Sequence, residues 1–203
     1  MKNVLHRIGK DIWAYVMCIF IAIMLWDWIF NLLTQIKTEE KVSVFIGSYT
    51  TGFEKTNELN ENRPEYLKVV EVNAYSVNDG MFNTFLSVFG YEVGDILILP
   101  ESRLREDTCA GYFAEISATY QGVFENLGYY TTDDGKAYGI KIYDKQTDEK
   151  AISSINYVAE GKEKENFYLL FNKKSVHLSD LSDDGKRSDM DGAIEIAKRL
   201  LAL

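Results

Sequence analysis

The 203-residue chain has only two prolines, two cysteines and two histidines. So little proline argues against long polyproline linkers and proline-rich disordered tails. Cys18 lies in an apolar segment and Cys109 lies far along the chain, so we expect no disulfide and a small buried side chain at Cys109. His6 and His177 are too few to supply the several ligands of a zinc site.

Recognisable catalytic signatures are also lacking. The chain contains no G-x-S-x-G pentapeptide, and no family signature surrounds Cys109. A hydrolase would need Ser48, His177 and an acid within hydrogen-bonding reach, and the sequence gives no sign of such a group. We therefore expect a protein that is not an enzyme.

Charge is distributed unevenly along the chain. The total is −9, but the first 37 residues carry +2, which leaves −11 for the remainder; the charged residues of that first part are Lys2, Arg7, Lys10 and Lys37 against Asp11 and Asp27. So acidic a remainder argues against nucleic-acid binding through a general electrostatic field.

Residues 12–33 form a long apolar run with a single charge, Asp27. As a helix they would extend about 33 Å, enough to cross a hydrocarbon core of about 30 Å. Aromatic side chains cluster at both ends of the run, as they do at the two membrane interfaces: Trp13, Tyr15, Trp26, Trp28 and Phe30. The pattern predicts a transmembrane anchor in contact with lipid.

The positive charges predict the direction of the anchor. Lys2, Arg7 and Lys10 precede it, whereas the lysines after it are offset by Glu39 and Glu40. We therefore expect residues 1–11 in the cytoplasm, residues 34–40 as a neck and residues 41–203 as an extracytoplasmic domain at the cell membrane. Two alternatives stay open. A cleaved signal peptide would have a shorter apolar region and a small-residue cleavage site, and a buried helix of a soluble domain would have aromatics on fewer faces.

The remainder predicts an α/β domain. We expect strands at residues 41–47, 66–74, 94–100 and 166–171, helices at 79–91 and 190–203, and a hairpin over 129–143 that turns at Asp134 and Gly135. Near-continuous apolar strands separated by helices indicate a small, mostly parallel sheet in a three-layer arrangement.

Several segments resemble the extracellular solute-binding proteins of ABC importers, in their type II form. The similar stretches are residues 94–104 (GDILILPESRL), 113–117 (FAEIS), 138–140 (YGI), and 166–175 followed by 193–201. The resemblance implies that the domain corresponds to one lobe of such a protein. Full members have two lobes and about twice this length, so here a second lobe is absent or stunted.

Ligands of open α/β sheets gather beyond the carboxyl ends of the strands. That rule selects polar and aromatic side chains as candidate ligand-binding residues: Ser48, Tyr49, Asn73, Tyr75 and Glu101. Separately, Asp180, Ser182, Asp184 and Asp191 have the spacing of positions 1, 3, 5 and 12 of a calcium loop. The loop departs from that pattern because Arg187 replaces an apolar residue and Asp191 replaces the bidentate Glu. A solvated turn before a capped helix is the alternative.

Two functions follow as expectations. The first is a membrane-anchored binding or accessory domain that recognises an extracellular small ligand, beside an ABC transporter. The second is a structural or assembly subunit of an envelope complex that acts through contacts with a membrane-protein partner. The sequence predicts no cofactor apart from the calcium alternative.

Overall fold

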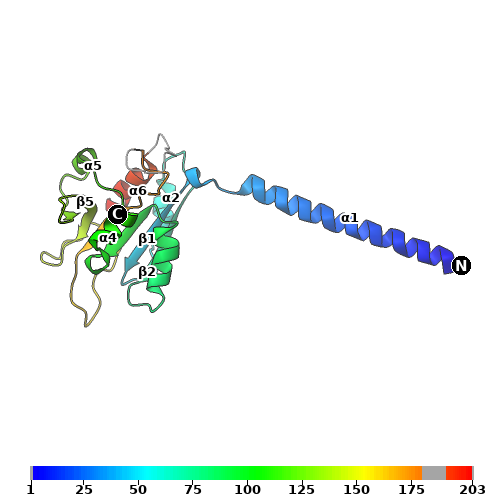
Figure 1. Ribbon diagram of the computed structural model, residues 1–203, viewed down its shortest axis with the longest axis horizontal. Coiled ribbons are helices and arrows are strands. Elements are labelled where there is room, and N and C mark those ends of the chain that lie inside the picture. Colours follow the sequence, from blue (N-terminus) through cyan, green and yellow to red (C-terminus); the bar gives the residue numbers. More distant parts are fainter. Residues whose placement is uncertain (1, 180–190, 203) are drawn as a thin grey trace. The chain divides into compact units, whose positions relative to one another are not determined.

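The computed structural model describes residues 2–179 and 191–202 and divides into two compact units, Met1–Lys37 and Thr38–Leu203. The first unit is one long helix, α1 (Lys2–Thr34), drawn in blue in Figure 1. Its segment Ile12–Phe30 has a mean hydropathy of 2.0 and side chains exposed to solvent. It is long and apolar enough to span a membrane, and a signal sequence near the amino terminus would have the same properties.

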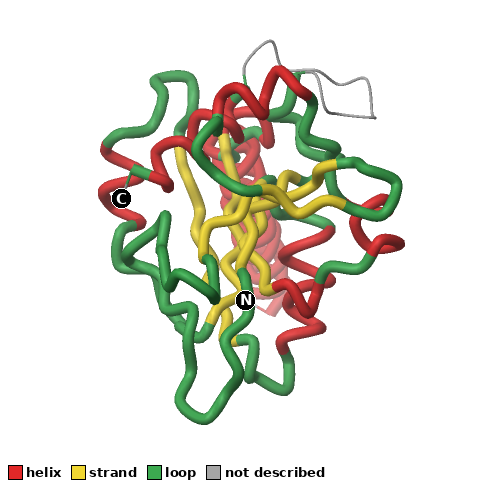
Figure 2. The backbone as a smooth tube through the Cα atoms, turned by 90° about the vertical axis from the view of Figure 1, so that its left-hand side faces the viewer, coloured by secondary structure: helices red, strands yellow, loops and turns green. Residues whose placement is uncertain are grey.

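The second unit is built on one six-stranded sheet with the order β2-β1-β3-β6-β5-β4. The strands are β1 (Lys41–Ser48), β2 (Val69–Ser76), β3 (Ile96–Pro100), β4 (Tyr129–Thr131), β5 (Ala137–Tyr143) and β6 (Phe167–Phe171). Figure 2 shows the sheet in yellow between helices on its two sides. The α/β class and the apolar helix before it are therefore as expected.

The expectation of a mostly parallel sheet was wrong, because the sheet is mixed. β1 pairs in parallel with β2 and with β3, but β6 runs antiparallel to β3, β5 antiparallel to β6, and β4 antiparallel to β5. The antiparallel half arises because β4 and β5 form the expected hairpin and β6 inserts between β5 and β3. The pairings of β6 with β3 and with β5 join segments far apart in the sequence and leave no trace in the local hydrophobic pattern.

Helices cover both faces of the sheet. On one face, α2 (Thr56–Glu61), α5 (Ala118–Val123) and α6 (Gly192–Leu201) pack against a core that includes Val44 and Ile98. On the other face, α3 (Phe82–Phe85), the π-helical turn η2 (Leu86–Tyr91) and α4 (Glu106–Tyr112) pack against Phe45 and Leu97. Two short 3₁₀ turns, η1 (Thr38–Glu40) and η3 (Glu101–Arg103), precede β1 and follow β3.

The sequence of β1 explains its central place. Val42, Val44 and Ile46 alternate onto one face and Phe45 lies on the other, so both faces of the strand are buried. Gly47 leaves space for the Phe82 ring: a Cβ atom there would lie 2.7 Å from Phe82 Cζ. The absence of a side chain at this position therefore brings α3 close to the carboxyl end of β1.

Most element boundaries agree with the expected ones within a few residues. β2 is the main exception, since it begins at Val69 and ends at Ser76 rather than spanning residues 66–74. Leu67 instead closes a turn by donating its N–H to the Pro64 carbonyl at 3.0 Å. The helix expected over residues 79–91 is present as α3 followed by η2.

Candidate functional site

A cavity of about 230 Å³ lies at the carboxyl ends of the three parallel strands, and we call it the strand-end cavity. Its wall combines residues that follow β1, β2 and β3 with residues that precede β6. These residues are Tyr49, Val77, Asn78, Pro100, Ser102, Arg103, Lys162, Glu163 and Glu165. Because β6 runs antiparallel to β3, its amino end shares the edge at which the parallel strands finish.

Glu165 links the strand ends on either side of the cavity. Its Oε2 atom accepts a 3.0 Å hydrogen bond from the Ser102 backbone N–H, and its Oε1 atom accepts one of 3.4 Å from the Tyr49 hydroxyl. Burial, together with the Glu165 charge and hydrogen bond, raises the pKa of Tyr49. The phenol therefore keeps its proton and acts as a donor toward the cavity.

Arg103 gives the cavity wall a fixed positive charge. Its Nη1 atom donates to Asn83 Oδ1 at 3.0 Å, and its guanidinium carbon lies 5.3 Å from the centroid of the Phe82 ring. These contacts hold the side chain by a hydrogen bond and a cation–π interaction. Among the residues that the structure describes, neither Arg103 nor Lys162 forms an ion pair with a carboxylate. The wall thus offers donors and cations as well as its own acidic groups.

Of the five candidate ligand-binding residues, only Tyr49 lines this cavity. Ser48 is fully buried, and its hydroxyl is engaged locally: it lies 2.8 Å from Thr50 Oγ1 and accepts the Thr50 N–H at 3.2 Å. Ser48 therefore stabilises the turn by which the chain leaves β1, and Tyr49 lies in that turn.

Asn73 and Tyr75 lie within β2 rather than after it, opposite Phe45 and Gly47 of β1. The Tyr75 ring stacks on three other rings, with centroid separations of 5.3 Å to Phe45, 4.6 Å to Phe85 and 6.0 Å to Phe89. The structure therefore places Tyr75 in the packing between β2 and the α3–η2 segment.

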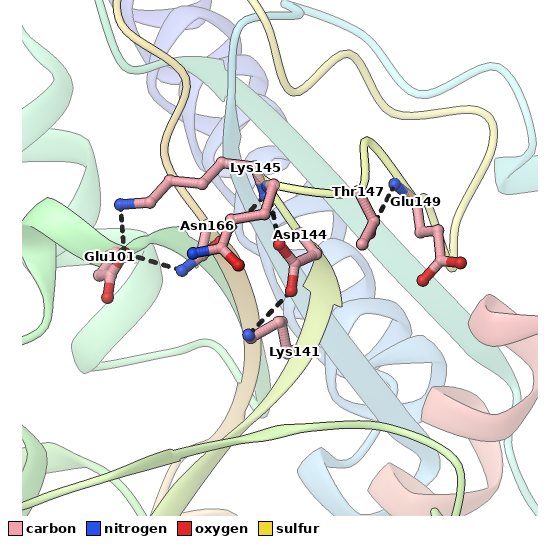
Figure 3. Close-up of polar contacts among 8 residues, drawn as sticks. Glu101, Lys141, Asp144, Lys145, Thr147, Glu149 and Asn166 are labelled. Atoms are coloured by element: carbon pink, nitrogen blue, oxygen red, sulfur yellow. Dashed lines mark hydrogen bonds and ion pairs between the residues drawn. The ribbon is translucent and has the colours of Figure 1, made fainter.

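Glu101 begins η3, is not part of the strand-end cavity wall, and joins a polar network (Figure 3). Its Oε2 atom accepts from Asn166 Nδ2 at 3.0 Å and lies 3.5 Å from Lys145 Nζ. Asn166 Oδ1 in turn accepts the Lys145 backbone N–H at 3.0 Å. The network ties the turn after β3 to the loop after β5 and to the start of β6.

The calcium hypothesis concerns a segment that is mostly outside the described residues, namely Asp180, Ser182 and Asp184. Asp191 is described, and its Oδ1 atom accepts hydrogen bonds from the Ser179 N–H, the Ser179 hydroxyl and the Tyr120 hydroxyl at 2.9, 2.6 and 3.0 Å. No group of three or more potential metal-binding His, Cys, Asp or Glu side chains occurs in the described parts of the chain.

A second polar cluster lies at the opposite end of β1 and is buried. The His177 Nε2 atom lies 3.0 Å from the Thr38 carbonyl and 2.8 Å from the Lys41 carbonyl, so this nitrogen carries the proton. Ser48 lies at the other end of the strand, about 20 Å away at the usual rise per residue. The pair that a hydrolase would need is therefore not formed.

The hydroxyl of Ser175, two residues before His177, is also unsuited to a nucleophile–base pair. Ser175 donates its hydrogen to Asp95 Oδ1 at 2.6 Å and accepts the backbone N–H of His177 at 3.1 Å. Asp95 and His177 are buried, as is Ser175. These side chains connect β1, β3 and the segment after β6, and their contacts are those of a structural network.

A larger hollow of about 430 Å³ lies beside β5 and the turn that contains Gly128. Two of its charged wall residues, Lys141 and Asp144, pair with each other at 3.0 Å, as Figure 3 shows. It lies at the carboxyl end of β5, which β6 separates from β3, and so it is not where the carboxyl ends of the parallel pairs β1–β2 and β1–β3 meet, the place where α/β sheets bind their ligands. We therefore take the smaller strand-end cavity as the candidate site.

Comparisons of this chain with protein-family models, with curated proteins and with solved structures found no match.

Proposed function

We propose that this chain is a membrane-anchored, extracytoplasmic binding domain and that the strand-end cavity is its ligand site. The observation that carries the proposal is the convergence of side chains from three strand ends on one cavity, at the edge where open α/β sheets bind ligands. The apolar segment Ile12–Phe30 supports the anchor. The acidic domain after it suits an aqueous compartment rather than an anionic lipid surface.

The resemblance of several segments to solute-binding proteins adds a partner to this proposal. An anchored domain of that type works beside a membrane protein, such as the permease of an ABC transporter. A one-lobed form binds its ligand without closure of a second lobe, so its affinity depends on the contacts of this single cavity wall.

Location and binding are tested separately. For location, we expect the chain to stay with the membrane fraction after carbonate extraction, and protease added to intact cells to cleave the part after Thr38. Recovery of the mature protein in the soluble fraction, shortened at its amino terminus, would instead identify residues 1–33 as a cleaved signal peptide.

For binding, the full chain in detergent micelles is screened by thermal shift against sugars, amino acids, short peptides and organic acids. We expect one class to raise the unfolding temperature, and Arg103→Gln to abolish that rise. Lys174→Gln is the matched control, because Lys174 is an exposed cation paired with Glu92 at the other edge of the sheet. No shift with any class, or equal shifts in both variants, would contradict binding at this cavity.

One surface favours the second function, an assembly subunit that acts through protein contacts. Four apolar residues on and beside the α3–η2 segment are exposed, with residue accessibilities of 53%, 48%, 39% and 50% for Met81, Val88, Phe89 and Val93. Exposed apolar groups gathered on one segment are typical of contact surfaces. Val88→Lys is expected to release a co-purifying membrane partner if this function holds, and Arg103→Gln is not.

A further inference from the structure

The Glu165 carboxylate occupies a ready-made acceptor position at the strand-end cavity. One of its oxygens faces the Ser102 N–H at 3.0 Å and the other faces the Tyr49 hydroxyl at 3.4 Å. The two donors come from the ends of different strands, β3 and β1. They therefore form a small cradle for a carboxylate group, and the group that fills it belongs to the chain itself.

The cavity wall carries two cations, Arg103 and Lys162, and two carboxylates, Glu163 and Glu165, so it becomes net positive once Glu165 has left the cradle. In that state it favours an anion over a neutral ligand. Arg103 and Lys162 line the same cavity, and Arg103 is held in place by Asn83 and the Phe82 ring. A guanidinium so held keeps further N–H donors for a ligand. The cavity holds about 230 Å³, which is below the range of about 300–1,000 Å³ for drug-sized ligands. Its ligand is accordingly small.

The loop that carries Glu165 is held loosely on the cavity side. Lys162, Glu163 and Lys164 are exposed, and Glu165 itself is only partly buried. The bond from Tyr49 to Glu165 is long, and the ion pair of Lys164 with Asp148 lies on the surface, where such pairs contribute little. The carboxylate can therefore leave the cradle without disturbing the core.

We infer that the strand-end cavity takes a small ligand bearing a carboxylate, and that this ligand displaces Glu165 from the Ser102 N–H and the Tyr49 hydroxyl. Glu165 acts as an internal competitor that occupies the cradle while the cavity is empty of ligand. Arg103 pairs with the incoming carboxylate. The inference rests on the proposed binding function and specifies the chemistry of its ligand.

The test measures binding to the full chain in detergent micelles by titration calorimetry. Succinate is the probe, and succinamide is its neutral counterpart. Removing the competitor by Glu165→Ala is expected to tighten succinate binding about tenfold, equivalent to about 1.4 kcal/mol. Glu165→Gln should tighten it less, because the amide oxygen can still accept from the two donors, although more weakly than the charged carboxylate. Adding Arg103→Gln to Glu165→Ala is expected to remove the gain.

Glu163→Gln is the matched control. It removes the same charge from the same loop and cavity, but Glu163 makes no hydrogen bond to Ser102 or Tyr49 among the described contacts. Its general electrostatic effect should disappear at 0.5 M salt, where the Debye length is about 4 Å and exposed charges farther apart than that are screened. The effect of Glu165→Ala should remain. Equal effects of the two variants at high salt would overturn the competitor role.

The Ser102 amide gives a direct readout of the exchange. In proton–nitrogen NMR spectra its proton is expected to move upfield in Glu165→Ala and to return downfield when succinate is added, while unfolding midpoints of the variants confirm that they fold.

Further probes identify the source of the carboxylate and distinguish a failure of this inference from a failure of the proposed binding function. Triglycine with a free and with an amidated carboxyl terminus distinguishes a peptide end from a free acid. Binding of neutral sugars but of no carboxylate would overturn the inference and leave the binding function standing. No binding of any probe to the wild type or to Glu165→Ala would overturn both.

Discussion

The hydroxyl of Ser175 donates a 2.6 Å hydrogen bond to Asp95 although both side chains are buried. The second Asp95 oxygen accepts the backbone N–H of Ser43 at 2.8 Å. One carboxylate thus joins the amino-terminal half of β1, the start of β3 and the segment that follows β6.

Asp95→Ala is expected to lower the free energy of unfolding by about 2–4 kcal/mol. The change leaves the Ser43 N–H and the Ser175 hydroxyl buried without an acceptor, and each unpaired group costs about 1–3 kcal/mol. Urea unfolding followed by tyrosine fluorescence measures the loss. Asp95→Asn keeps one acceptor and should lose less. Equal losses in the two variants would mean that side-chain volume matters here rather than hydrogen bonding.

Asp95 also predicts a pH dependence. Burial raises its pKa above the ordinary value of 3.8, against the opposing effects of His177 and the hydrogen bonds from Ser175 and Ser43. The folded state therefore holds this proton more tightly than the unfolded state does. The contribution of the group to stability should fall as pH rises from about 4, the unfolded pKa, through the folded pKa.

The measurement for this pH effect is the difference in unfolding free energy between the wild type and Asp95→Asn, taken from pH 4 to pH 7. The wild type should lose stability relative to Asp95→Asn as pH rises. A difference that stays flat, or that moves in favour of the wild type, would show that the hydrogen bonds outweigh burial.

Gly94→Ala is expected to destabilise the domain by about 1–3 kcal/mol. A Cβ atom at Gly94 would lie 2.8 Å from the Gly90 carbonyl oxygen, and a backbone atom cannot rotate away as a side chain can. Gly111→Ala is the control, because a Cβ atom at Gly111 in α4 meets nothing within 4 Å. That change should stabilise the helix by about 0.5–1 kcal/mol. Thermal unfolding should therefore shift in opposite directions for the two variants.

Cys109 should resist alkylation in the folded protein. Its side chain is buried, and burial raises its thiol pKa to about 11, so little reactive thiolate forms at pH 8. In a Cys18→Ser background, iodoacetamide labelling followed by mass spectrometry should be slow without urea and fast with it. A Ser87→Cys, Cys109→Ser variant supplies an exposed thiol for comparison. Similar rates for the two thiols in native buffer would contradict the burial.

The strands of the central sheet were predictable because their sequences suit burial on both faces. β1, β3 and β6 all coincide closely with expected apolar runs, and β3 ends at Pro100, the last residue of the expected run. The direction of β6 was not predictable in the same way. Its pairing with β3 depends on contacts between residues far apart in the sequence, which a local apolar pattern does not encode.

The same limitation explains what sequence reasoning missed at the candidate site. The rule of strand ends led to Tyr49, and it pointed close to Ser102 and Arg103. It had no means of including Lys162 and Glu165, because they precede a strand rather than follow one. Only the antiparallel direction of β6 brings them to this edge. Likewise β2 ends at Ser76, two residues later than expected, so Tyr75 lies in the strand and packs against the α3–η2 segment instead of lying in a loop.

The carbonyls of Thr38 and Lys41, which accept the hydrogen bonds of the His177 N–H, determine where the chain can be shortened. A version that begins at residue 38 keeps Thr38 and Lys41, whereas one that begins at residue 42 deletes both acceptors and leaves an imidazole N–H stranded in the interior. The strand-end cavity lies at the other end of the same strand. A detergent-free sample for ligand work should therefore start no later than Thr38. Removal of residues 1–37 deletes no residue of the cavity wall.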